Sequence, residues 1–382
     1  MRAEFPPELR LLLSAVRAAL GTATPPESSE KIDWEIFLLW VERHRVGAML
    51  HQRLARSFGD HCPAGVVQRL RHLATDNLRR ALAQASEQVT LIRLLKEHQI
   101  DVLSVKGLVL SQQLYGNLHT RPVGDIDLIL RPTDAARADE LIQRAGWRRI
   151  NPDFPLTPLQ LRKFVEIQPE FEYWRDEPPS RVELRWRLEG PGDIAALIPR
   201  ALKQSLGGPV VHTLPADFNA VYLLQHGARH GWFRLFWLID IASMMRGAAF
   251  APEALLKEAR AADAERSVWQ GCALVEELLG VPCPEILRPP PRERRVIARL
   301  CADARWMLSA ELGELASVRG WLRQLIYRMR LQRTIQGKWA VLTPHLHTPR
   351  TWGMWSLPDR WFFLYHLAAP FLWLWRRAWR AR

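Results

Sequence analysis

Two aspartates at the start of an apolar run constrain this chain more than any other feature. Asp125 and Asp127 flank Ile126, and the apolar run continues to Leu130. Side chains alternate between the two faces of a strand, so both carboxylates project to one side while Ile126 turns toward the core. Adjacent carboxylates repel each other unless a cation lies between them, and a hard divalent ion with oxygen ligands suits that position. The pattern therefore predicts a phosphoryl-transfer or nucleotidyl-transfer site that holds Mg²⁺.

The surrounding residues predict a compact unit of strand, turn, helix and strand. Residues 102–105 form a short apolar strand, which the pair Lys106-Gly107 ends. Residues 108–115 carry leucines at helical spacing and are followed by a Gly-Asn pair, a typical helix end. Aspartates are common at strand ends for ordinary reasons, so Asp-x-Asp alone is a weak signal. It is this unit that favours a metal site.

At these residues the chain resembles the uncharacterised nucleotidyltransferases of the DNA polymerase beta superfamily. Their signature is a lysine-glycine turn, a helix ending near a tyrosine, and an arginine shortly before Asp-x-Asp. In this sequence the matching residues are Lys106, Gly107, Tyr115, Arg121, Asp125 and Asp127.

The resemblance extends to three further segments. A later strand supplies a third acid in the family, and residues 182–187 match it with Glu183 as the acid, although Arg185 stands where the family usually has histidine. Residues 34–54, which include His44-Arg45-Val46, are similar to the N-terminal helical element of the family. Residues 223–245 are similar to its downstream helical motif.

The resemblance implies an α+β fold: a polymerase-beta-like nucleotidyltransferase core, with a small mixed sheet and flanking helices, between N-terminal and C-terminal helical regions. Proline clusters and composition divide the chain into an N-terminal helical region, the core, a helical domain and a basic, tryptophan-rich C-terminal region, at residues 1–82, 83–190, 191–288 and 289–382. Periodicity predicts helices at 8–20, 34–56, 66–82, 84–98 and 133–145, a strand at 147–150, a hairpin of 170–175 with 181–187, and helices again from 216.

The implied reaction is Mg²⁺-dependent transfer of a nucleoside monophosphate from a nucleoside triphosphate to a hydroxyl or phosphate acceptor. In two-metal transfer, one ion activates the acceptor oxygen and the other steadies the triphosphate and the leaving pyrophosphate. Asp125 and Asp127 are the predicted ligands of both ions, and Glu183 completes the acceptor-side ion; Mn²⁺ is the alternative metal. A surface glutamate on a half-exposed strand is the other interpretation of Glu183, with Glu170 and Glu172 as reserve candidates.

Three residues are predicted to bind the triphosphate. Lys106 lies at a strand-to-helix turn, where backbone N–H groups and the helix dipole favour anions. Gly107 lets a phosphate approach the backbone closely. Arg121 can clamp phosphate oxygens with two hydrogen bonds. The ordinary alternatives are solvent exposure for Lys106 and a salt bridge to the acids for Arg121.

His226 and His230 are one helical turn apart and share a face, a spacing that can bind zinc. No third ligand is apparent nearby, so a structural pair in a helical packing seam is the favoured interpretation. Asp240 is expected to hydrogen-bond one of these histidines or to cap a helix, and not to be catalytic.

Composition limits the class of protein. With 48% hydrophobic and 24% charged residues the chain is globular, and its length suits two or three compact units. The four cysteines are far apart, which argues against a zinc cluster or a disulfide framework and suits a reducing cytoplasm. The N-terminus reads as an amphipathic helix and not as a signal peptide.

The C-terminal region carries most of the net charge of +13. Residues 321–382 contain eleven Arg or Lys against one acid, and eight of the seventeen tryptophans. Within this region Trp321, Leu322, Leu325, Ile326 and Met329 are predicted to form one apolar stripe, and the apolar run 361–375 is too short to span a bilayer. Three interpretations remain open: peripheral contact with the inner membrane surface, nucleic-acid binding, and a helix packed on the protein's own core.

Two functions from different classes therefore compete. The first is the enzyme described above, acting in the cytoplasm, with neither the base of the nucleotide nor the acceptor selected by the sequence. The second is a non-catalytic regulatory or binding module on the same fold, which docks on a membrane or nucleic acid through its basic C-terminal region. The intact acid pair with Lys106 and Arg121 favours the enzyme.

Overall fold

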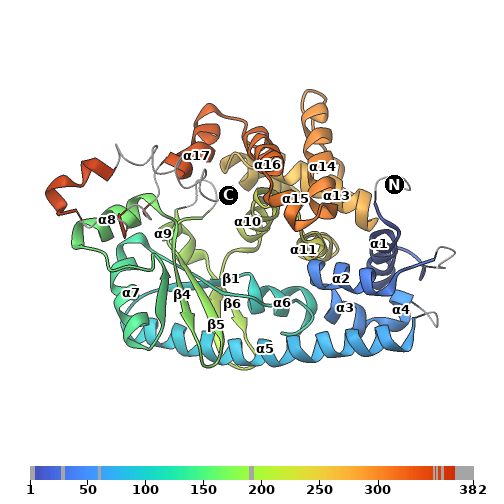
Figure 1. The fold of residues 1–382 in the computed structure, drawn as a ribbon, viewed down its shortest axis with the longest axis horizontal. Helices are drawn as coiled ribbons and strands as arrows, with labels where there is room; N and C mark the ends of the chain where they lie inside the picture. The colour runs from blue at the N-terminus through green and yellow to red at the C-terminus, as the bar shows by residue number, and fades with distance from the viewer. Residues whose placement is uncertain are drawn as a thin grey trace.

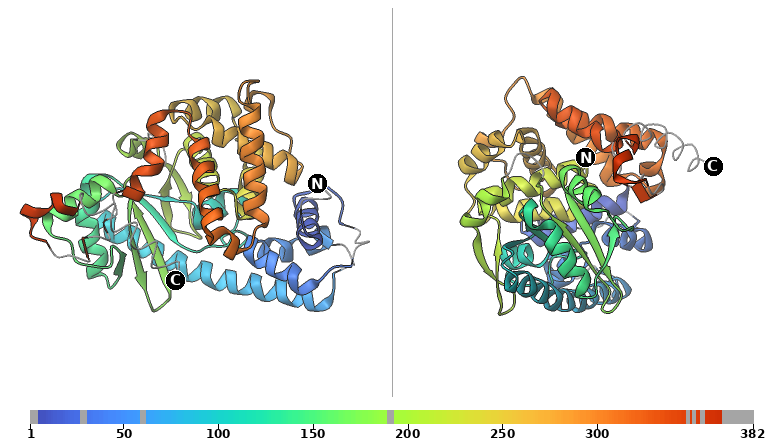
Figure 2. Two further views of the ribbon diagram at one scale, coloured as in Figure 1. Left: turned by 45° about the horizontal axis from the view of Figure 1, so that its top comes forward. Right: turned by 90° about the vertical axis from the view of Figure 1, so that its left-hand side faces the viewer.

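A computed structural model describes residues 5–26, 31–58, 62–188, 193–346, 349, 352–353 and 357–365 of the chain. A small sheet lies toward one end of the molecule, and the N-terminal helices lie toward the other (Figure 1). The 34-residue helix α5 (Ala64–Glu97) runs along one side beneath both. Figure 2 shows the helices that follow residue 216 on the opposite side from α5. The predicted α+β class, a small mixed sheet with flanking helices, is confirmed.

The sheet has five strands in the order β1-β2-β5-β4-β3. Strand β2 is parallel to β5, and the other three pairings are antiparallel. Both β1 and β2 are fully buried, which explains their apolar composition. The strand bounds are β1 Val102–Val105, β2 Ile126–Leu130, β3 Arg148–Asn151, β4 Glu170–Arg175 and β5 Ser180–Arg185.

Helix α6 (Gly107–Tyr115) joins β1 to β2, as the sequence predicts, and Gly116 ends it in the left-handed conformation. After β2 a 3₁₀ turn (Pro132–Asp134) precedes α7 (Ala135–Arg144), so the helix begins later than expected and Thr133 does not cap it. Helix α8 (Pro158–Ile167) was not predicted, although Thr157 and Gln160 form a capping box at its start.

The N-terminal helices differ from the prediction in two places. The segment 34–56 was expected to be one helix, but α2 (Trp34–His44) ends at Arg45 in the left-handed conformation, and α3 (Gly47–Gln52) and α4 (Leu54–Phe58) follow. The helices expected at 66–82 and 84–98 are one continuous helix, α5. The boundary predicted after residue 82 therefore lies within α5, which the N-terminal region and the core share.

Helices from the two ends of the chain form one hydrophobic core. The apolar faces of α1 (Pro7–Leu20) and α2 pack in the same cluster as those of the helices after residue 216. A second hydrophobic cluster lies between the sheet and the helices α5, α7 and α8. The remaining elements are α9 Ile194–Leu197, the hairpin β6 Leu202–Ser205 with β7 Val210–Thr213, α10 Ala216–Arg229, α11 Leu235–Met245, α12 Pro252–Ala261, α13 Glu265–Leu279, α14 Arg294–Ser309, α15 Leu312–Ala316, α16 Val318–Leu331 and α17 Ile335–Leu346.

The C-terminal region packs partly on the rest of the protein. The predicted apolar stripe lies on α16, where its members Leu322 and Ile326 are exposed. Tyr327, which is not part of the stripe, is buried and donates to the Ala228 carbonyl at 2.7 Å. Trp352 and Tyr365 are buried in the core cluster of the sheet. Among the described residues no helix is long and apolar enough to cross a membrane. Of the run 361–375, residues 366–375 lie outside the described part of the chain.

Candidate active site

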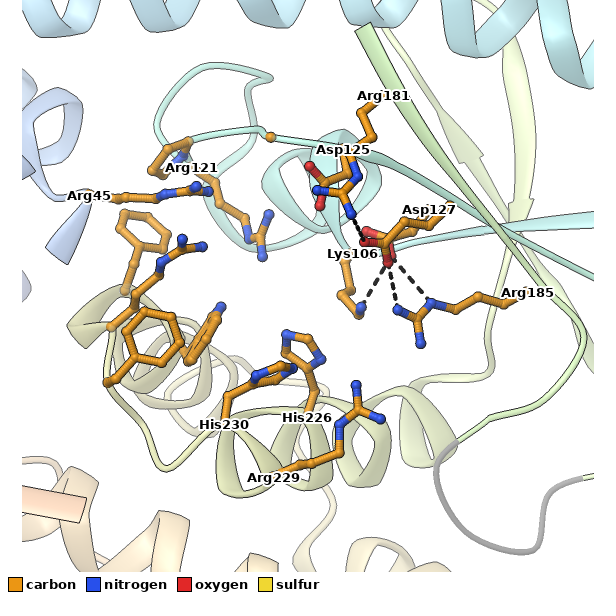
Figure 3. Close-up of a pocket in the computed structure, with 18 of the residues that line it drawn as sticks. Arg45, Lys106, Arg121, Asp125, Asp127, Arg181, Arg185, His226, Arg229 and His230 are labelled. Carbon is orange, nitrogen blue, oxygen red and sulfur yellow. Dashed lines mark hydrogen bonds and ion pairs between the residues drawn. The ribbon is translucent and has the colours of Figure 1, made fainter. Parts of the chain in front are cut away.

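A polar pocket of about 350 Å³ lies where β5 and the start of β2 face α10 and α11 (Figure 3). This volume is within the range of about 300 to 1,000 Å³ that is typical of ligand sites. Seven Arg or Lys, five acids and two histidines line it, together with a few apolar side chains. The charged and histidine residues are Arg45, Lys106, Arg121, Asp125, Asp127, Glu170, Glu172, Arg181, Glu183, Arg185, His226, Arg229, His230 and Arg234.

All three predicted metal ligands line this pocket. Asp127 lies on β2 and is in register with Glu183 on the parallel strand β5. Asp125 lies just before β2, in a loop that the Gln84 amide holds by donating to the Gly124 carbonyl at 2.9 Å. The start of β2 and the neighbouring strand β5 thus bring the three acids together.

Asp125 is the least compensated of the three acids. Burial raises its pKa above the ordinary value, and repulsion from Asp127 and Glu183 raises it further. Arg181 and Arg45 oppose this shift without cancelling it. A cation placed beside Asp125 would therefore relieve an unfavourable interaction.

Arg185 connects the acids of β2, β4 and β5. Its guanidinium lies 2.5 Å from Glu183, 2.6 Å from Glu170 and 3.8 Å from Asp127. Burial alone would raise the pKa of Glu183, but Arg185 holds it below the ordinary value. Burial raises the pKa of Glu170 to about 7, in spite of Arg185. Arg185 thus neutralises part of the acidic site.

The reserve candidate Glu172 also lines the pocket and is paired with a basic group. It accepts hydrogen bonds from Asn151 at 3.0 Å and from Arg181, whose guanidinium also lies 3.9 Å from Glu183. Glu170 and Glu172 therefore belong to the same charged network as the three predicted acids.

Lys106 is buried and not solvent-exposed. Its ammonium lies 3.1 Å from Asp127 and 5.1 Å from the centre of the Tyr222 ring. Burial opposes its positive charge, but Asp127 and Tyr222 raise its pKa above the ordinary value. Both Lys106 and Gly107 have positive φ, and an added Cβ on Gly107 would lie 3.5 Å from the Asp125 carbonyl. A turn with such sparsely populated backbone angles is typical of a functional site.

Arg121 makes an ion pair with Asp240 of α11 at 2.9 Å, and not with the predicted metal ligands, which was the alternative to phosphate binding. Asp240 also accepts from the Tyr115 hydroxyl at 2.8 Å. The expectation that Asp240 bonds a histidine or caps a helix is therefore wrong. Asp240 thus joins Arg121 and Tyr115 to α11 and holds Arg121 at the pocket wall.

His226 and His230 lie on the face of α10 that looks across the pocket toward the acids, beside Arg229 (Figure 3). Their rings are 4.7 Å apart and contact Trp237 of α11. The prediction of a packing pair is correct for the Trp237 contact but omits that both rings line the pocket. Hydrophobic periodicity could not have revealed this, because it does not show which elements face each other.

The residue types suit Mg²⁺, which prefers carboxylate oxygens. Among the described residues, however, no three His, Cys, Asp or Glu side chains are already grouped to hold a metal ion. Instead, the Lys106 ammonium lies beside Asp127, and the guanidinium groups of Arg181 and Arg185 lie beside Glu183. The three acids therefore suit Mg²⁺ because their ligand atoms are carboxylate oxygens and because the strand register places Asp127 beside Glu183.

Comparison with known proteins identifies the family of the chain without reference to the geometry of the pocket. No curated protein and no solved structure matches it significantly. One family model, described as "Uncharacterised nucleotidyltransferase", matches residues 30–280, which include every residue that lines the pocket. Since this match covers more than half of the chain, the protein belongs to that family of uncharacterised nucleotidyltransferases.

Proposed function

We propose that the protein is a Mg²⁺-dependent enzyme that transfers a nucleoside monophosphate from a nucleoside triphosphate to a hydroxyl or phosphate acceptor. One observation carries the proposal: three acids, two at the start of β2 and one on the neighbouring strand β5, share a pocket with seven basic side chains. Acids alone would suit a metal store, and basic groups alone would suit any anion. Their combination suits a metal-bound polyphosphate.

The reaction exchanges one phosphoester bond for another. The acceptor oxygen bonds to the α-phosphorus, and the bond from that phosphorus to the α,β-bridging oxygen breaks with its electrons leaving on pyrophosphate. A hydroxyl acceptor also gives up its proton to solvent. Asp125, Asp127 and Glu183 would hold Mg²⁺, which supplies charge stabilisation for the attacking and leaving oxygens.

The protein's own groups would position the substrate. The turn at Lys106 and Gly107 opens the nine-residue helix α6, so its N–H groups and dipole favour a phosphate there. Lys106 would exchange part of its contact with Asp127 for a phosphate oxygen. Arg121, held by Asp240, presents a rigid guanidinium to the same anion.

One observation favours the alternative, a non-catalytic binding module. Lys106 and Arg185 neutralise Asp127 and Glu183 within the protein, so these acids are stable without a metal. A module of this kind would keep the internal pairs closed and bind its partner elsewhere. The two functions differ in one measurable property, the formation of a labelled product.

The test uses the four nucleoside triphosphates, each labelled at the α-phosphate and incubated with purified protein and cell extract. The proposal predicts that one label passes to an acceptor with Mg²⁺ and not with a chelator present. Asp153→Asn, an exposed position outside the pocket, is the matched control for loss of a carboxylate. No labelled product with any of the four, from folded protein, would favour the binding module.

A further inference from the structure

Two pocket arginines, Arg45 and Arg234, differ from the other basic residues around them. Lys106, Arg121 and Arg185 each contact a carboxylate. Within the described part of the chain, neither Arg45 nor Arg234 makes a hydrogen bond or an ion pair with its side chain, and both are partly buried. Partly buried guanidinium groups with open donors are available for a ligand.

The fold brings these two arginines together by a specific contact between their neighbours. The Leu235 amide donates to the His44 Nδ1 at 3.2 Å, and His44 is completely buried. Arg45 follows His44 at the left-handed end of α2, and Arg234 precedes Leu235 at the start of α11. The contact joins residues 191 positions apart and thereby fixes Arg45 and Arg234 side by side at the pocket.

Both guanidinium groups are supported by packing. Arg234 lies 5.0 Å from the centre of the Phe233 ring and 5.6 Å from that of Trp237. A Cβ added at Gly124 would lie 3.3 Å from an Arg45 nitrogen, so glycine there leaves room for this side chain. Packing of this kind holds the donors in place and reduces the entropy lost when a ligand binds.

The two charges are unfavourable together in the absence of an anion. Burial lowers the pKa of Arg234 to about 10, and the proximity of Arg45 contributes to the shift. Burial also lowers the pKa of Arg45; Asp125 opposes this, and Arg121 adds to it. An anion between the two groups would offset this repulsion.

We propose that Arg45 and Arg234, the arginine pair, bind the terminal phosphates of the nucleoside triphosphate. This inference rests on the proposed function and assigns an orientation to the triphosphate within the pocket. Glu183 is the predicted acceptor-side acid, whereas Arg45 lies on the Asp125 side, away from Arg185 (Figure 3). Attacking and leaving oxygens lie in line on opposite sides of the phosphorus, so pyrophosphate would leave toward the arginine pair.

The test measures binding of inorganic pyrophosphate to the full chain by calorimetry, which needs no knowledge of the acceptor. Arg45→Gln and Arg234→Gln should each weaken pyrophosphate binding by about tenfold or more, as expected for a lost charge-assisted hydrogen bond. Arg144→Gln, on the exposed face of α7, should leave it unchanged. Binding of each nucleoside triphosphate should weaken in parallel, and binding of the monophosphate should not.

The outcomes separate this inference from the proposed function. Unchanged pyrophosphate binding in both variants would overturn the arginine pair as a phosphate site, even if the wild type transfers nucleotides. Weaker pyrophosphate binding with unchanged triphosphate binding would mean that the pair holds an acceptor phosphate, which overturns the assignment to the donor. The predicted losses in a protein that transfers no nucleotide would support the site and contradict the enzyme.

A second variant and a second measurement test whether the substituted proteins still fold. Arg45→Lys keeps a charge but removes the forked geometry, so its pyrophosphate affinity should lie between those of wild type and Arg45→Gln. Circular dichroism that matches the wild type establishes that the lost binding is local. If Arg45→Gln does not fold, Arg45→Lys and Arg234→Gln decide the question.

Discussion

At the scale of single residues, the site combines acids that repel one another with bases that only partly neutralise them. Arg185 and Lys106 compensate Glu183 and Asp127, while the raised pKa of Asp125 reflects burial and the two neighbouring acids. The sequence alone could predict the acids, because strand alternation and the family signature act over a few residues. It could not predict which bases pair with them, because these contacts depend on the register of β2 with β5.

The first prediction concerns the triphosphate contacts of Lys106 and Arg121. Lys106→Met should weaken triphosphate binding by about tenfold, and monophosphate binding much less, because its proposed partner is a phosphate beyond the α position. Arg121→Lys should also be defective, since a point charge cannot replace a guanidinium that binds Asp240 and phosphate together. The exposed Lys96→Met and Arg144→Lys are the controls. Equal losses for both ligands in calorimetry would point to a purely structural role.

At the scale of elements, contacts between distant helices place the functional side chains. The strand–turn–helix–strand unit at 102–130 could be predicted because its signals are local. The end of α2 could not, because Arg45 adopts positive φ without being glycine, and only packing against α11 explains it. The capping box at Thr157 is a local sequence signal from which α8 could have been predicted. The residues around 82–84 contain no helix-ending signal, so α5 could also have been predicted as one helix.

The second prediction concerns pH and the contact between His44 and α11. Burial, with a smaller effect of Arg43, lowers the pKa of His44 to about 3. As pH falls below about 6.5, the unfolded chain takes up a proton on this histidine and the folded chain does not. Protonation therefore favours the unfolded chain, and the stability contributed by neutral His44 is fully present only above that pH. Between pH 7 and pH 5 this residue should remove about 2 kcal/mol of stability.

Urea unfolding at the two pH values checks this prediction. His44→Gln should be less stable than the wild type at pH 7 and should lose less stability on acidification, because glutamine does not titrate. The difference between the two proteins isolates His44 from all other titrating groups. An identical loss in both would show that His44 is not the buried neutral acceptor of the Leu235 amide.

At the scale of the whole molecule, the N-terminal helices and the helices after residue 216 form one core, and Arg45 with residues of α10 and α11 lines one side of the pocket. Arg45 comes before the sheet in the chain and Arg234 after it, so the site is complete only when all three parts are folded. Composition could predict a basic, tryptophan-rich end, but not which tryptophans are buried, because that depends on contacts with the sheet. Cytoplasmic location and membrane contact remain predictions.

The third prediction concerns the C-terminal region as a structural part of the fold. A chain that ends after residue 317 loses α16, including the buried Tyr327, and the buried Trp352 and Tyr365. We expect it to be insoluble or several kcal/mol less stable, since each large buried side chain contributes about 3 kcal/mol or more. Denaturant unfolding of both chains measures this. A truncated chain as stable as the full one would show that this region does not belong to the core.

The fourth prediction concerns the membrane interpretation of the same region. Leu322 and Ile326 are exposed on one face of α16, beside a region rich in arginine. If that face binds a membrane, the full chain should float with vesicles of anionic lipid, less so at high salt, and the double change of Leu322→Gln and Ile326→Gln should reduce flotation. If flotation depends neither on lipid charge nor on the two substitutions, this face of α16 is not the membrane-binding surface. Binding to RNA with a steep salt dependence would favour the nucleic-acid interpretation instead.

The most direct test of the enzyme assignment is the transfer rate of Asp125→Asn and Asp127→Asn, once a labelled product identifies the working triphosphate. Each change should lower the rate by about 10³-fold, the scale of a lost electrostatic contact to the transition state, with the fold retained. The double variant should be little worse than either single one, because the two carboxylates act as a unit. Near-normal transfer by folded Asp127→Asn, beside an unchanged Asp153→Asn control, would contradict the account.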